Sequence, residues 1–351
     1  MLGEAMKLLA KTPRGLEKVA AKAIEELLPH VKAFPRPNGY LGIVIVEGAK
    51  SGDAEEVLRN VPEVEKLFEV MAECPADLKA IARAAARVAA KSLRKGETFA
   101  VRTTRRGRHG FTSIDVNVRA GAKIQEVTGN PVNLSYPDKI VWIEIIGDKA
   151  LISVTPGEVE RKKSYPGKPN VVDMLKKIVV AQMPYLGDLK AAYKMGVRIG
   201  RAAQTLELGA LYITPTGPVD AWELARFLEG LNEGMESRLE IQRKTYARRV
   251  SKVPVYVYNI YQFVREFADE NIIVTSTRGR AISERETREK IKELFKGRRV
   301  IIMIGSREGV PTGIFRYSKL VVDVIPGITL STDLALSSCV TAIVDAAILE
   351  D

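Results

Sequence analysis

Cysteine and histidine, the side chains most used for metal and redox chemistry, are scarce in this chain of 351 residues. The sequence has two of each: Cys74, Cys339, His30 and His109. The cysteines lie far apart and have no partners at the spacing of metal ligands. We therefore expect no disulfide framework, no zinc site and no other metal. Both cysteines are predicted to be small apolar side chains of the interior.

Long apolar runs are also missing. No stretch approaches the 18 uninterrupted apolar residues typical of a membrane-spanning helix. The first residues, MLGEAMKLLAKT, place Glu4 and Lys7 where a secretion signal needs an apolar core. We therefore expect a cytoplasmic protein without a membrane anchor. Its length and its 46% apolar content predict two to three folded domains.

Positive charge is unevenly distributed along the chain, whose net charge is +11. Residues 1–78 hold 10 Lys or Arg against 13 Asp or Glu, residues 79–168 hold 18 against 8, and residues 169–351 hold 26 against 22. The middle segment thus carries nearly all of the excess. A localised positive field favours a polyanionic partner, because each phosphate that is neutralised releases counterions.

The first 77 residues alternate between strand and helix patterns. Residues 6–11 and 40–47 are predicted strands, and a periodic apolar stripe after Pro13 predicts a helix that ends near Leu28. A second helix is expected from Asp53 as far as Leu67. This order is half of a split βαβ sandwich, a ferredoxin-like arrangement. The segment contains no catalytic grouping, and we interpret it as a scaffold.

Residues 78–168 carry the basic excess. A long Ala-rich helix pattern from Leu78 places cations three to four residues apart on one face, which is also typical of an ordinary solvated helix. A strand pattern at 99–103 then leads into the run RRGRHG at 105–110. Like charges this close repel each other without an anionic partner, so we predict RNA contact. The predicted RNA-binding residues are Arg102, Arg105, Arg106, Arg108, Lys162 and Lys163.

Residues 169–351 are predicted to form an α/β domain with a parallel sheet, beginning after a Pro- and Gly-rich boundary. Three apolar strand patterns, at 271–275, 300–304 and 320–325, end in polar or glycine-bearing loops. At the carboxyl ends of parallel strands such loops form a ligand crevice, where glycine lets backbone amides approach closely. A nucleotide-like ligand is expected. Any parallel α/β domain with glycine loops would show the same pattern.

The loops at 305–309 (GSREG) and 330–333 (LSTD) resemble the second and third motifs of the SPOUT class of RNA methyltransferases. The resemblance implies a knotted α/β domain, S-adenosylmethionine as cofactor and a homodimer paired through the knot region. Glu308 lies one position later than in the commonest ribose-methylating form, and LSTD replaces its usual Ser-Leu-Asn. The residues implied to bind the cofactor are Thr275, Ser276, Ile304, Gly305, Gly309, Ile325, Gly327, Leu330, Ser331, Thr332 and Ala335.

Residues 78–155 resemble the THUMP domain in their helix, their FAVRTTRRGRHG stretch and the Val-Asn-Leu and Ile-Glu-Ile patterns that follow. With an N-terminal ferredoxin-like partner, this resemblance implies recognition of tRNA at its acceptor end. Other enzymes that carry THUMP domains are disfavoured, since Asp/Asn-Pro-Pro-Tyr, a Ser-Gly-Gly loop and a His-Glu motif with paired cysteines are all missing.

The helix segment MGVRIGRAAQTLELGALYI resembles the first motif of the ribose-methylating SPOUT branch. Arg201 matches the arginine of that motif, Met195 stands where an asparagine is usual, and Arg198 is a second possibility. Either arginine could also be an ordinary surface residue. A guanidinium stays protonated, so its implied role is to position a phosphate and stabilise a developing alkoxide. Glu308, Asp333 or an RNA phosphate could take the proton. The candidate catalytic residues are Arg201, Glu308 and Asp333.

The sequence thus predicts a ferredoxin-like domain at residues 1–77, a THUMP domain at 78–168 and a SPOUT domain at 169–351. The predicted activity is S-adenosylmethionine-dependent methylation of tRNA, at a ribose 2′-hydroxyl in or near the acceptor stem. Two alternatives remain open. One is a base methyltransferase of the same class, and the other is a non-catalytic THUMP protein that only binds RNA.

Overall fold

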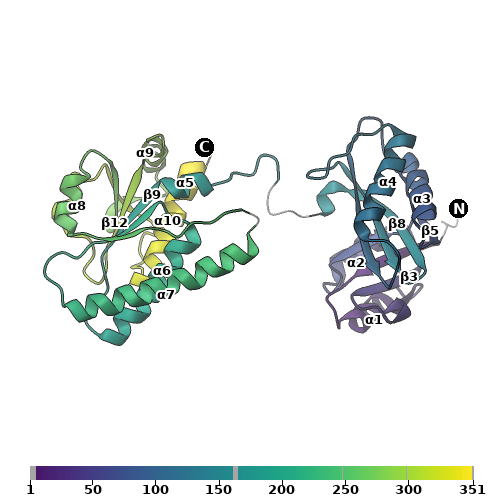
Figure 1. Ribbon diagram of the computed structural model, residues 1–351, viewed down its shortest axis with the longest axis horizontal. Coiled ribbons are helices and arrows are strands. Elements are labelled where there is room, and N and C mark those ends of the chain that lie inside the picture. The colour runs from purple at the N-terminus through teal and green to yellow at the C-terminus, as the bar shows by residue number, and fades with distance from the viewer. Residues whose placement is uncertain (1–4, 161–164, 247, 298, 350–351) are drawn as a thin grey trace. The chain divides into compact units, whose positions relative to one another are not determined.

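The computed structural model describes residues 5–160, 165–246, 248–297 and 299–349. The chain divides into two compact units, residues 1–168 and 169–351, both drawn in Figure 1. Among the described residues, no helix combines the length and the apolar character that crossing a membrane requires. The division of residues 1–168 into two domains stays a prediction.

The first unit contains two four-stranded sheets, and two helices pack on each. The first sheet is antiparallel with the order β2-β3-β1-β4, and the second has the order β5-β8-β7-β6 with β6 parallel to β7. Their elements are β1 Met6–Lys11, α1 Glu17–Leu27, β2 Lys32–Pro35, η1 Pro37–Gly39, β3 Ile43–Ala49, α2 Asp53–Asn60, β4 Lys66–Glu69, β5 Ala72–Pro75, α3 Leu78–Ser92, β6 Phe99–Arg106, α4 Ser113–Thr128, β7 Lys139–Ile146, β8 Lys149–Pro156 and η2 Gly157–Val159.

The faces of the two sheets that are not covered by helices share one apolar core. Phe68 of β4 stacks against Trp142 of β7, with ring centroids 5.0 Å apart. Beside them Glu144, 1% exposed, forms ion pairs with Lys11 of β1 and Arg106 of β6. A buried carboxylate needs such partners, because an uncompensated charge in the interior is costly. The pair with Lys11 therefore ties the two sheets together, and the pair with Arg106 joins neighbouring strands of the second sheet.

The second unit is built on one parallel sheet with the order β11-β10-β9-β13-β12-β14. Helices α6, α7, α9 and α10 contribute to the core on one face, and α8 and η3 cover the other (Figure 1). Its elements are α5 Val172–Lys177, β9 Ile178–Gln182, α6 Leu189–Leu206, β10 Ala210–Ile213, α7 Ala221–Thr245, β11 Val255–Val257, α8 Ile260–Glu266, β12 Asn271–Ala281, α9 Arg285–Phe295, β13 Val300–Ile304, η3 Thr312–Tyr317, β14 Leu320–Asp323 and α10 Thr332–Ile348.

Helices α6 and α7 pack backbone against backbone through four glycines. A Cβ atom added at Gly196, Gly200, Gly230 or Gly234 would lie between 2.0 and 2.1 Å from a carbonyl oxygen of the facing helix. No side chain fits there. Glycine at these positions therefore lets the two helices approach more closely than any other residue type would allow. This contact fixes α6, which carries both arginines that were considered for catalysis.

The predicted fold class is confirmed: two sheets that each carry helices on one face are followed by a six-stranded parallel sheet. The second helix was predicted too long, because α2 ends at Asn60 and Leu67 lies in β4. Pro62 explains the early end, since the residue before a proline disfavours helical geometry. Strand β12 is longer than predicted and runs through to Ala281.

Glu17, at the first position of α1, is a fully buried carboxylate. Its Oε1 accepts hydrogen bonds from the amides of Gly15 at 2.9 Å and Gly42 at 2.6 Å, and its Oε2 accepts one from Arg36 at 2.8 Å. Burial raises the pKa of Glu17, but these bonds outweigh burial and hold the pKa at about 2. The carboxylate therefore joins the start of α1 to the loop before β3.

Replacing Glu17 by Gln should lower the free energy of unfolding of this part of the chain by about 1–3 kcal/mol at neutral pH, because a charged acceptor with three donors is lost. The folded pKa is depressed from 4.5 to about 2, so the contribution is present above about pH 4.5 and is lost as the pH falls through 2. Urea unfolding, read by hydrogen exchange in residues 5–70, should show the difference shrinking over that range. Glu26→Gln, on the exposed side of α1, is the control. A difference that does not change with pH would contradict the assignment.

Candidate functional site

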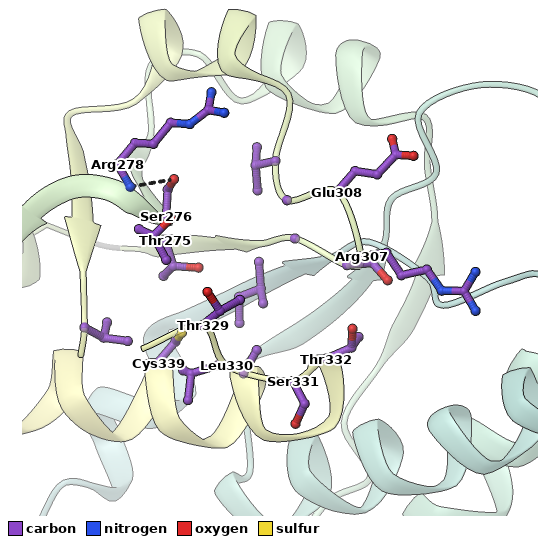
Figure 2. Close-up of a pocket in the computed structure, with 18 of the residues that line it drawn as sticks. Thr275, Ser276, Arg278, Arg307, Glu308, Thr329, Leu330, Ser331, Thr332 and Cys339 are labelled. Atoms are coloured by element: carbon purple, nitrogen blue, oxygen red, sulfur yellow. Dashed lines mark hydrogen bonds between the residues drawn. The ribbon is translucent and has the colours of Figure 1, made fainter. Parts of the chain in front are cut away.

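A cleft of about 660 Å³ opens beside β12 and the carboxyl ends of β13 and β14. Its walls come from residues 275–278, 304–312 and 323–332, and from the first turns of α10 (Figure 2). The three predicted segments converge, but the first is an irregular part of β12 and not a loop, because the strand continues to Ala281. A volume of this size is typical of a site for a small molecule or cofactor.

The floor of the cleft depends on an unusual pairing of β14. Val322 lies beside Thr275 and again beside Arg280, so that β12 contacts the same strand before and after a bulge at 276–279. A Cβ atom at Gly279 would lie 2.5 Å from the carbonyl carbon of Val322. In the loop after β13, a Cβ atom at Gly305 would lie 2.5 Å from the Cα of Gly309. Glycine is required at both positions because backbone meets backbone.

Most of the residues implied to bind the cofactor lie in the wall of the cleft, although their role stays a prediction. Gly327 is not among the lining residues. The lining also includes side chains that the sequence did not single out, such as Tyr185, Arg278 and Phe315. Tyr185 follows β9, so the rule that ligand sites gather at carboxyl ends of strands could have pointed to it. The implied residues in the wall are Thr275, Ser276, Ile304, Gly305, Gly309, Ile325, Leu330, Ser331, Thr332 and Ala335.

Polar groups beneath the cleft hold its loops in place. Gln182, fully buried at the end of β9, donates from Nε2 to the carbonyl oxygen of Gly305 at 3.2 Å. Thr275 donates from Oγ1 to the carbonyl oxygen of Met303 at 3.1 Å. Cys339 of α10 lines the cleft and is 3% exposed, and burial raises its pKa to about 11. Its thiol is therefore neutral and unreactive near neutral pH.

The burial predicted for the cysteines is confirmed for Cys339 and wrong for Cys74, which is half-buried on β5. Strand β5 lies at the edge of its sheet, where one side is open to water. Among the described residues, no group of three His, Cys, Asp or Glu side chains could hold a metal ion.

Of the three candidate catalytic residues, only Glu308 lines the cleft. Its side chain is exposed at the mouth (Figure 2). Arg201 lies on the side of α6 that faces α7, where its Nη2 donates to Ser237 Oγ at 2.9 Å. Met195, at the position where the resemblance has an asparagine, does line the cleft. The helix therefore turns Met195 toward the cleft and Arg201 toward α7.

Asp333, in the first turn of α10, is held by two donors. Ser331 Oγ donates to its Oδ1 at 2.7 Å, and Arg198 Nη1 donates to its Oδ2 at 2.7 Å. The hydrogen bond from Ser331, together with the charge of Arg198, holds the pKa of Asp333 below its ordinary value. A carboxylate stabilised in this way is a weaker base, and Asp333 does not line the cleft. It supports the loop that does.

Two of the arginines predicted to bind RNA are engaged inside the protein. Arg102 donates to both carboxylate oxygens of Glu160, at 2.8 and 3.0 Å, and Arg106 donates to Glu144 at 2.7 Å. Arg105 donates to the carbonyl oxygen of Gly107 at 3.2 Å and remains partly exposed, and Arg108 is exposed. Lys162 and Lys163 lie outside the described residues. Arg105 and Arg108 are therefore the cations of this run that face solvent.

Residues 172–351 match the family described as AF2226-like SPOUT RNA methylase fused to THUMP, and residues 75–155 match the THUMP domain. The chain is 38% identical to the uncharacterized protein MJ0421 of Methanocaldococcus jannaschii over 341 residues, which cover 96% of this chain and 93% of that protein. It is 31% identical to the tRNA (guanine(6)-N2)-methyltransferase of Archaeoglobus fulgidus over 147 residues, 40% of this chain and 36% of that one. A probable tRNA sulfurtransferase of M. jannaschii is 39% identical over 85 residues, 23% of this chain and 22% of that one.

Replacing Ser331 by Ala should raise the pKa of Asp333 toward its ordinary value of 3.8, because the donor that contributes most to lowering it is removed. Arg198→Ala should move the pKa in the same direction. Carboxyl ¹³C resonances followed through an acid titration measure both changes. Ser337→Ala, further along α10, is the control. An Asp333 pKa that neither variant moves would show that these contacts do not form in solution.

Proposed function

The chain belongs to the family of AF2226-like SPOUT RNA methylases fused to THUMP, and from that premise we propose that it is an S-adenosylmethionine-dependent tRNA methyltransferase. We propose a ribose 2′-hydroxyl in or near the acceptor stem as the methylated group. The observation that carries the proposal is the cleft formed by β12 and by the loops after β13 and β14, where Gly305 has no room for a side chain.

The cleft suits a nucleoside-containing cofactor. Ile304, Ile325 and Leu330 provide apolar walls, while backbone groups and the hydroxyls of Ser276 and Thr332 provide polar partners. Gly305 lets the loop after β13 fold back on itself, since a Cβ there would lie 2.5 Å from the Cα of Gly309. When bound, S-adenosylmethionine supplies an electrophilic methyl group. The protein must then align the acceptor oxygen with that methyl group and remove the proton of the oxygen.

A tRNA substrate is supported by the THUMP match and by the relatives, whose names describe enzymes acting on tRNA. One of them is named for a guanine numbered 6, near the 5′ end of tRNA. The excess of positive charge in residues 79–168 suits a polyanion. We therefore assign RNA recognition to the first unit, residues 1–168.

Glu308 is the side chain that we assign to proton removal, because it is an exposed carboxylate at the mouth of the cleft. Asp333 is less suited, since its negative charge is stabilised by Ser331 and Arg198. The cation that positions the RNA phosphate is Arg201 by resemblance. Geometry favours Arg198, which reaches the loop at 330–333 through Asp333.

The homodimer implied by the resemblance is part of the proposal. Leu334 and Ile328 are 56% and 54% exposed beside the cleft. Large exposed apolar side chains that cluster on a surface are typical of an interface. Sedimentation of the full chain reports its oligomeric state, and a monomer at all concentrations would remove this part of the proposal.

Replacing Arg105 and Arg108 together by Ala should weaken tRNA binding and flatten its salt dependence by up to about two units of slope, since the slope follows the number of phosphates contacted. Filter binding over a series of salt concentrations measures this. Lys18→Ala with Lys22→Ala, two exposed cations of the acidic first segment, is the matched control. An unaltered slope in the Arg105 and Arg108 variant would move RNA recognition elsewhere.

Calorimetry should show that the full chain binds S-adenosylmethionine, and single-turnover reactions should transfer its methyl group to tRNA. Gly305→Ala should abolish cofactor binding and leave tRNA binding intact, because its Cβ would overlap Gly309. Gly217→Ala, where a Cβ meets open space, is the control. Absence of cofactor binding by the natural chain would favour a non-catalytic RNA-binding protein.

Two further readouts of the same reaction assign the chemistry. Mass spectrometry of the digested product separates a methylated ribose from a methylated base, and a methylated base would overturn the ribose assignment. Arg198→Ala and Arg201→Ala distinguish the two cations. Replacing the arginine that stabilises the developing alkoxide should lower turnover by about 10² or more and leave cofactor affinity little changed. If neither does, proton removal and alignment do not depend on α6.

A further inference from the structure

Tyr185 and Arg307 form a stacked pair at the mouth of the cleft. Tyr185 lies in the loop between β9 and α6, and Arg307 lies in the loop after β13. The guanidinium carbon of Arg307 is 4.2 Å from the centre of the Tyr185 ring, and its Nη2 donates to the Tyr185 hydroxyl at 2.7 Å. Both residues line the cleft.

Structural support is a weak explanation for this pair. Arg307 is exposed, and Figure 2 shows its guanidinium extending away from the interior of the cleft. An exposed contact between a cation and an aromatic ring contributes little to stability. Arg307 stands between Ser306 and Glu308 in the loop that forms this wall of the cleft. Because Arg307 is exposed and adds little to stability, we look for its function in the binding of a ligand at the surface.

The chemistry of the pair fits a nucleobase. An aromatic ring carrying a planar guanidinium offers a flat, positively charged surface, and unstacked bases of RNA bind to such surfaces. The positive charge also attracts the phosphate groups on either side of the base. Phe315, another aromatic residue of the cleft, packs against the core formed with α8, whereas Tyr185 packs against the core on the other face of the sheet and carries Arg307.

We propose that Tyr185 and Arg307 hold the base of the target nucleotide after it has left the RNA helix. The inference rests on the proposed function and adds to it how the substrate is held. A nucleotide within a helix is restrained by pairing and stacking on both sides. Stacking on the pair offsets part of the cost of leaving the helix and brings the ribose to the cleft beside Glu308.

Equilibrium binding of tRNA to the full chain without cofactor tests the stacking. Tyr185→Ala should weaken binding about tenfold, whereas Tyr185→Phe, which keeps the ring and loses the hydroxyl, should stay within about twofold of the natural chain. Arg307→Ala should also weaken binding, and Arg307→Lys should restore only the part that depends on charge. Because Arg307 is exposed, its variants test the idea without disturbing the fold.

A set of tRNAs, each lacking one base of the acceptor region, identifies the stacked base. At one position the natural chain should bind the abasic tRNA about tenfold more weakly than intact tRNA, while Tyr185→Ala should bind both equally. For tRNAs that lack a base at any other position, Tyr185→Ala should reduce the binding affinity by the same factor as it does for intact tRNA. If Tyr185→Ala reduced the affinity by the same factor for every abasic tRNA, the pair would only hold two loops together, and the inference would be overturned. If Tyr185→Ala left the affinity for tRNA unchanged, the inference would be overturned as well.

The outcome separates this inference from the proposed function, because binding requires no methyl transfer. Dependence on one base without any methylated product would support the stacking and overturn the methyltransferase assignment. Methyl transfer without dependence on any base would do the reverse. Agreement between the abasic position and the methylated nucleotide would support both.

Discussion

The cleft depends on one close approach of backbone to backbone, that of β12 to β14. Val322 pairs with Thr275 and with Arg280, so the bulge of β12 at 276–279 is closed against a single strand. Gly279 allows this because no side chain fits between the two segments. The loops after β13 and β14 are then brought to the same edge as this bulge. The cofactor site that we propose is a consequence of that pairing.

Glycine has a similar effect in the packing of α6 on α7. The four glycines bring the two helices into backbone contact and thereby fix the direction in which each side chain of α6 points. Met195 faces the cleft, Arg198 reaches Asp333, and Arg201 contacts Ser237. Three residues within two turns of one helix thus have different surroundings, although each is a plausible site residue when only the sequence is considered.

Internal ion pairs reduce the positive charge that residues 79–168 present to RNA. The charge of residues 79–168 includes Arg102 and Arg106, and both are bound to glutamates of the same unit. Charge counted along the chain therefore overstates the charge that RNA can reach. The glutamate partners are distant in sequence, at 144 and 160, which is why a local reading of the basic run could not find them.

The sequence alone predicted β12, β13 and β14 of the second unit and the loops that follow β13 and β14, because β-branched runs and glycine signals are local properties of the chain. It also supplied the residues by which the family could be recognised. It did not reveal α7. It also did not reveal the short strands β2, β4 and β5, whose hydrogen-bond partners lie elsewhere in the chain. The packing of the fold settles which arginines pair with carboxylates and which face of α6 meets the cleft. Such outcomes depend on contacts between residues far apart in sequence, and no local pattern encodes them.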